Sequence, residues 1–155
     1  MNRWTLLRDN VLVALGALPL PRNVVIDKIV KPAGIDGVVG PVAIGVCLGG
    51  DRWQGPSEID NHEDQPATML VQIVIRADSA LNATAALDEV DEIAATVLTI
   101  RNVDIGIYGM GVGLDTGGVF LDGMRSDFLE FSNREPGGAG PVAKVFTMQT
   151  TVLPI

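Results

Sequence analysis

Residues 69–100 read MLVQIVIRADSALNATAALDEVDEIAATVLTI, and two hydrophobic periods meet in this stretch. From Met69 to Ala77 successive side chains alternate between two faces, one carrying Leu70, Gln72, Val74 and Arg76 and the other Val71, Ile73 and Ile75. Alternation of this kind is typical of a β-strand. From Asn82 or Thr84 to Ile100 the apolar spacing becomes three and four residues, which predicts a helix.

This helix is expected to have one apolar and one acidic face. The apolar face is formed by Leu87, Val90, Ile93, Ala94, Val97 and Ile100. Asn82 or Thr84 can accept the N-cap hydrogen bond. The first half carries Asp88, Glu89, Asp91 and Glu92, where the helix dipole favours negative charge. On the simpler interpretation, these acids form a solvent-exposed helix face. The more specific alternative is that they form a negatively charged wall that repels an anion.

Toward the N-terminus the same patterns predict a helix and two strands. Trp4–Leu18 has an apolar stripe of Leu7, Val11, Ala14, Leu15 and Leu18, and Pro19 ends it. Val24–Val30 is expected to be a short strand, Lys31–Gly37 a turn or loop, and Val42–Leu48 an apolar strand. The basic residue Arg3 and the run Val11–Leu15 imitate a leader peptide only loosely, because Arg8, Asp9 and Asn10 interrupt it.

Toward the C-terminus the chain is rich in glycine and in strand-forming residues. Strands are expected at Ser126–Phe131 and Lys144–Leu153, with turns from Asn133 to Pro141. We predict one α+β domain over residues 1–155, with a mainly antiparallel sheet and two principal helices. A protruding loop is expected at about residues 51–68, and a glycine-rich arm or hairpin at about residues 104–118.

The composition of the 155 residues excludes several classes of protein. Lys and Arg number 11 against 19 Asp and Glu, giving a net charge of −8, which disfavours phosphate binding and hence specific nucleic-acid binding. Charged residues make up 19% and apolar ones 47%, so intrinsic disorder is not expected. No apolar stretch is long enough for a membrane span. The apolar excess favours self-association, and a single Cys47 fits a reducing compartment.

Residues that could carry catalysis are few and poorly arranged. Asp60, His62 and Asp64 could face one cation from an extended loop, which leaves a small metal-dependent enzyme as a minor alternative. Ser57, Ser79, Ser126 and Ser132 lack the Gly-x-Ser-x-Gly turn, and Cys47 lies in an apolar strand. The glycine run 109–115 matches no nucleotide-binding motif. We therefore expect no catalytic, metal or cofactor-binding residues, and a protein that is not an enzyme.

Several apolar side chains are candidates for contacts with other proteins. The candidate interface residues are Trp53, Met110, Val112, Leu114, Phe146 and Met148.

The order of elements resembles the tail terminator (tail-tube completion) proteins of long-tailed phages. The matching features are the helix Trp4–Leu18, the strands Val42–Leu48 and Met69–Ala77, the acidic helix Ala85–Ile100 and the last strand Lys144–Leu153. The similarity spans nearly the whole chain and rests on order and length, without a diagnostic motif. The segments Ile105–Gly118 and Asp51–Thr68 are long for that family.

The resemblance implies a structural virion protein of the tail or neck, assembled in the host cytoplasm. It implies a hexameric ring that caps the tail tube and contacts the tube protein and the head-side connector. Asp88, Glu89, Asp91 and Glu92 are candidate lumen acids, since like charges would let DNA pass without specific binding. The alternative within the class of tail and neck proteins is a head–tail connector, neck or tail-tube subunit. A capsid-decorating module is a further alternative outside that class.

Overall fold

The computed structural model describes residues 3–53, 67–79, 82–102, 120–129 and 140–152. In chain order the elements are α1 (Arg3–Gly16), β1 (Val24–Lys28), the 3-10 segment η1 (Pro32–Gly37), β2 (Val42–Trp53), β3 (Ala67–Ser79), α2 (Ala83–Val97), the 3-10 segment η3 (Leu98–Asn102), β4 (Phe120–Leu129) and β5 (Gly140–Val152).

The strands form one sheet in the order β1-β2-β3-β5-β4. β1 pairs with β2 in parallel, whereas β2–β3, β3–β5 and β4–β5 are antiparallel. The long central strands β3 and β5 stay in register from Ala67 opposite Val152 to Ser79 opposite Gly140. The predicted α+β class with a mainly antiparallel sheet is therefore confirmed.

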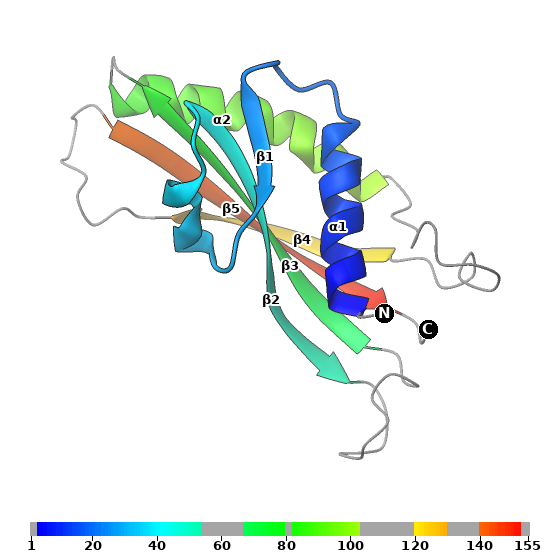
Figure 1. Cartoon of the computed structure of the whole chain (residues 1–155). Coiled ribbons are helices and arrows are strands. Elements are labelled where there is room, and N and C mark those ends of the chain that lie inside the picture. Colours follow the sequence, from blue (N-terminus) through cyan, green and yellow to red (C-terminus); the bar gives the residue numbers. More distant parts are fainter. Residues whose placement is uncertain (1–2, 54–66, 80–81, 103–119, 130–139, 153–155) are drawn as a thin grey trace.

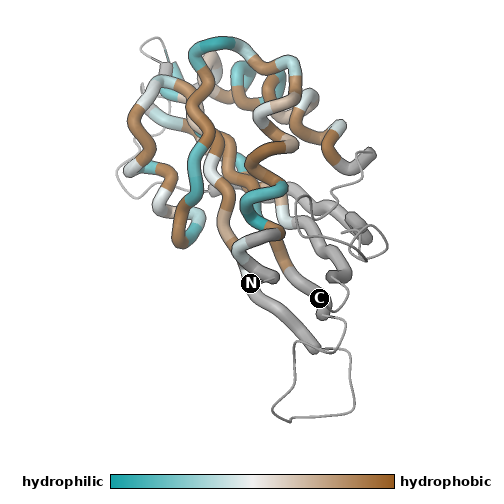
Figure 2. The backbone as a smooth tube through the Cα atoms, turned by 45° about the vertical axis from the view of Figure 1, so that its right-hand side comes forward, coloured by the Kyte–Doolittle hydropathy of each residue, from teal (hydrophilic) through white to brown (hydrophobic). Residues whose placement is uncertain are grey.

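Both helices cover the same face of the sheet. α1 packs on β1 and β2, and α2 packs on β3 and β5. The alternating residues Val71, Ile73 and Ile75 of β3 are fully buried against the apolar faces of the two helices. From the helices this core receives Leu7, Val11, Leu15, Ala86, Val90, Ile93, Ala94 and Val97. Hydrophobic residues accordingly follow the described strands through the middle of the molecule (Figure 2).

The opposite face of the sheet is covered by the connection between β1 and β2. Ile35 of η1 and Val38 lie over Ala43, Val74 and a short apolar patch of β5. In Figure 1, β1 has α1 on one side and η1 on the other. The parallel pairing of β1 and β2 requires such a crossover, because the chain must return to the starting end of the sheet.

The ends of the two helices agree with the sequence analysis to within a few residues. Asn82 has extended backbone angles, and its side-chain oxygen accepts a 2.8 Å hydrogen bond from the Ala85 N–H, so Asn82 is the N-cap. α1 ends at Gly16, just before Pro19. The continuation of the second helix to Ile100 is a 3-10 segment rather than α-helix.

The strands differ from the sequence analysis chiefly in length. β2 runs on to Trp53 and β3 begins at Ala67, so both ends of the predicted 51–68 loop belong to the sheet. A bulge between Leu48 and Gly50 lets the pair continue past the glycines. β5 starts at Gly140 within the predicted turn region, and β4 spans Phe120–Leu129 instead of Ser126–Phe131. The glycine-rich arm at about 104–118 lies outside the described residues.

Candidate interaction surfaces

The predicted interface residues fall into three groups. Phe146 is only 2% exposed and belongs to the core beneath the helices, so its prediction as an exposed contact residue is corrected. Trp53 ends β2 opposite Ala67, and Met148 lies in β5 opposite Val71. The remaining three, Met110, Val112 and Leu114, lie outside the described residues. Phe146 is buried because it shares a face of β5 with Val142, and α2 packs on that face.

The acids of α2 lie along its outer side. Asp88, Asp91 and Glu92 are exposed, Glu89 is half-buried, and the spacing of 88, 91 and 92 places those three on one helix face. No acid lies in the first turn of α2, so the expected stabilisation by the helix dipole is corrected, because the dipole acts mainly within that turn. The acids therefore form a charged surface rather than a helix cap.

Lys144 of β5 lies beside one of these acids, Asp91. Its ammonium nitrogen lies 3.4 Å from Oδ1 of Asp91 and 5.9 Å from the centre of the Phe146 ring. Within the described part of the chain, Asp88 and Glu92 have no cation at ion-pair distance. Asp91 is therefore the member of this face that lies beside β5, the neighbour of β4 in the sheet.

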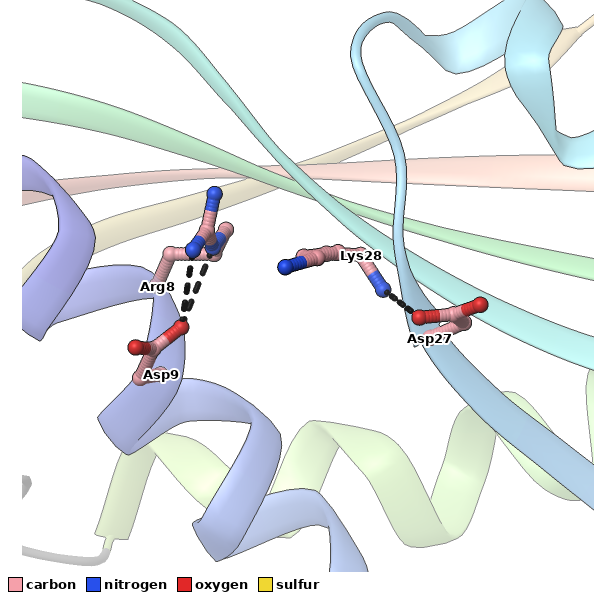
Figure 3. Close-up of polar contacts among 4 residues, drawn as sticks. All are labelled: Arg8, Asp9, Asp27 and Lys28. Atoms are coloured by element: carbon pink, nitrogen blue, oxygen red, sulfur yellow. Dashed lines mark hydrogen bonds and ion pairs between the residues drawn. The ribbon is translucent and has the colours of Figure 1, made fainter.

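The opposite end of the sheet, where α1 packs beside β1, carries cations. Figure 3 shows the Lys28 side chain reaching from β1 toward Arg8 of α1. The guanidinium of Arg8 forms an ion pair with the Asp9 carboxylate, with 3.0 Å between Nη2 and Oδ1. The Lys28 N–H donates to Oδ1 of Asp27 at 2.7 Å, while the next N–H, that of Ile29, bonds β2. The Asp27 carboxylate thus accepts the hydrogen bond of an N–H group on the open edge of β1. A charged side chain at such an edge hinders pairing with another strand.

The charge is divided unevenly along the chain. Residues 1–50 carry five Lys or Arg against three Asp or Glu, a net +2, and residues 51–155 carry six against sixteen, a net −10. Because α1, β1 and η1 belong to the first group, the excess of negative charge lies in the rest of the molecule.

The buried charge among the described residues is Arg76, which the sequence analysis treated as one member of an alternating face. Its guanidinium donates to the carbonyl of Ile35 at 2.7 Å and to the carbonyl of Gly40. Its Nε lies 3.7 Å from Oδ1 of Asp78 and has no hydrogen-bond partner. Arg76 therefore fastens the middle of the β1–β2 connection, at Ile35, and its last part, at Gly40, to the sheet. A charged residue in an otherwise apolar strand is the sequence signal for this role.

Cys47 is the free thiol of β2 and is buried. Burial raises the pKa of this thiol from 9.0 to about 11, so it is protonated at neutral pH. Its Sγ lies 3.7 Å from the amide oxygen of Gln72 on the neighbouring strand. A protonated, buried thiol packs as a small apolar group, as the sequence analysis expected, and is a poor nucleophile.

The other chemical candidates give little further information. Asp60, His62 and Asp64 lie outside the described residues, as do Ser57 and Ser132, and Ser79 and Ser126 lie in β3 and β4. Elsewhere, in the described ranges, no three His, Cys, Asp or Glu side chains are grouped to hold a metal ion. Nor does any helix there have both the length and the hydrophobicity to cross a membrane.

Comparison of the chain with models of known protein families finds no match. A search of curated proteins likewise finds no significant match. The function must therefore be argued from the fold and its surfaces.

Proposed function

We propose that this chain is a structural subunit of a phage tail, resembling tail terminator proteins, that closes into a ring at the end of the tail tube. The observation that carries the proposal is the element order. A helix precedes the sheet, a second helix follows its third strand, and the C-terminal strand β5 completes the sheet next to β3. The same order of helices and strands underlies the resemblance to tail terminator proteins.

Two surface properties support a role in assembly. Both end strands of the sheet, β1 and β4, have a neighbour on one side only among the described strands, and Asp27 occupies one edge N–H of β1, so the β4 edge is the better candidate for contact with a further chain. The acidic face of α2 and the net charge of −8 suit a protein that meets DNA without retaining it. In the proposed virion the partners are further copies of this chain, the tail-tube protein and the head-side connector.

The test is whether the pure protein forms closed rings that end a tube. Native mass spectrometry at micromolar concentration should show one closed oligomer, six copies being the expected number. Electron microscopy with tail tubes should then show rings at tube ends. Open filaments of the pure protein would instead indicate a tail-tube subunit, because a head-to-tail contact that does not close polymerises. A strict monomer that never binds tubes would refute the proposal.

A further inference from the structure

The open edge of the sheet lies along β4. This strand pairs with β5 on one side, and no described strand pairs with its other side. The edge at the opposite end of the sheet is partly closed, because the Asp27 carboxylate accepts the hydrogen bond of the Lys28 N–H in β1. An open edge offers its N–H and C=O groups to a further strand. The sequence of β4 therefore indicates which strand fits beside it.

The regular part of β4 is residues 123–129. The register with β5 shifts between Leu121 and Gly123, and from Gly123 to Leu129 the pairing is continuous. Ser126 is the middle residue of this range. Two antiparallel copies of β4 that overlap over the whole range therefore place Ser126 opposite Ser126, because a two-fold axis sets each residue opposite the one equally far beyond the centre.

This register brings opposite charges together. Arg125 of each copy lies opposite Asp127 of the other, so each pair of strands contains the match twice. On its other side, β4 meets uncharged residues at the same positions, Thr147 opposite Arg125 and Val145 opposite Asp127. Moving the centre by one residue would place Arg125 opposite itself or Asp127 opposite itself, and like charges directly opposed destabilise a strand pair. The overlap and the charges thus favour the same register.

At the alternate positions the same register is apolar, with Met124 of each copy opposite Phe128 of the other, and a sulfur–aromatic pair is favourable. We infer that β4 pairs antiparallel with β4 of a second copy of this chain, centred on Ser126, so that two sheets join into one. The contact is isologous and joins copies two at a time. It goes beyond the proposed ring and does not depend on it, because a ring of copies related by rotation alone would use this contact to join a second ring.

A cysteine at the centre of the contact tests the register. In Ser126→Cys the two new thiols lie opposite each other with Cα atoms about 4.5–5.5 Å apart, a separation that a disulfide spans. Mild oxidation should therefore give a covalent dimer on non-reducing electrophoresis. Met124→Cys is the matched control, because its two thiols would be about 13 Å apart along the strands. The wild type, whose single Cys47 is buried, is the blank.

Charge reversal tests the same contact in solution by sedimentation velocity and native mass spectrometry. Arg125→Asp alone and Asp127→Arg alone should each raise the apparent dissociation constant about tenfold or more, because both matches in the pair become repulsive. An equimolar mixture of the two variants should form mixed dimers, and the double variant should pair with itself, because every opposed position then carries opposite charges. Asp36→Lys and Lys31→Glu, on and before η1, are controls that should leave pairing unchanged.

The outcomes separate this contact from the proposed function. Single rings that cap tubes and ignore the β4 variants would overturn the contact while leaving the tail function in place. Dimers that cross-link at position 126 but never cap tubes would support the contact and refute the function. Equal cross-linking at position 124, or reversals without mutual rescue, would overturn the contact. Circular dichroism checks that each variant is folded, and if a reversal unfolds the chain, the two cysteine variants decide.

Discussion

Arg76 offers the sharpest test of how the fold is held together. Replacing it by methionine, Arg76→Met, keeps a long side chain in the same space and removes the guanidinium. The carbonyls of Ile35 and Gly40 then lose their donor, and η1 loses its polar attachment to the sheet. The apolar contacts of Ile35 with the sheet remain, so the substitution isolates the hydrogen bonds.

The expected magnitude follows from the contacts. A hydrogen bond that involves a charged group contributes about 1.5–3 kcal/mol, and Arg76 makes two. The burial of a guanidinium whose Nε has no hydrogen bond offsets part of this, while the Asp78 pair contributes little because Asp78 is half exposed. We expect the free energy of unfolding to fall by about 2–4 kcal/mol. For a domain of this size the melting temperature should fall by roughly 6–12 °C.

Urea unfolding followed by circular dichroism measures the loss, with Arg8→Met as the matched control. Arg8 pairs with its own neighbour Asp9 at the surface, so its replacement should cost no more than about 0.5 kcal/mol. Hydrogen exchange adds a local readout, because the amides of residues 33–38 should exchange faster in Arg76→Met. A core control, Ile73→Val, lowers stability without releasing η1. A loss below about 1 kcal/mol, or unchanged exchange in residues 33–38, would refute the role assigned to Arg76.

Three other predictions concern Gly45, Asn82 and Cys47. A Cβ on Gly45 would lie 2.6 Å from Cδ1 of Ile29, so Gly45→Ala should lower the free energy of unfolding by about 1–2 kcal/mol in urea melts. At Gly37 nothing lies within 4 Å, and the same substitution should change stability far less. Asn82→Ala removes the N-cap of α2 and should cost about 1 kcal/mol by the same assay; an unchanged melt would argue against the cap. The Cys47 pKa is raised from 9.0 to about 11, so the fold disfavours the thiolate and stability should decline as pH rises through that range. Cys47→Ala should remove this decline in urea melts at about pH 8 and pH 10.5, and an identical pH profile in both proteins would contradict it.

The sequence predicts those parts of the fold in which local pattern and tertiary packing agree. The alternation from Val71 to Ile75 separates the two faces of β3 correctly, since Val71, Ile73 and Ile75 share the core beneath the helices whereas Val74 lies in the second core cluster. Asn82, one of the two predicted candidates, caps the predicted helix. Both follow from periodicity and capping, which need no knowledge of the partner strand. The two helices are recovered for the same reason.

The rest depends on partners that the local pattern does not reveal. Gly49–Asp51 interrupts the apolar alternation, yet β2 continues to Trp53 because β3 pairs with it beyond the bulge. Arg76 alternates like a solvent-facing residue, but η1 covers it with the chain's own carbonyls. Phe146 alternates into the helix-covered face once its register with Ile73 is known. Each difference comes from contacts between segments distant in sequence.

The position of β5 has a consequence for how the protein is made. β5 (Gly140–Val152) follows all the other described elements in sequence but lies between β3 and β4 in the sheet. During synthesis the strands β1, β2 and β3 can pair as they emerge, and α1 can pack on them. In contrast, β4 has no strand with which to pair until residues 140–152 have been made. A nascent chain that stops before Gly140 therefore exposes one edge of β3 and leaves β4 unattached, a state prone to aggregation. Only chains that include β5 can therefore complete the sheet as far as β4.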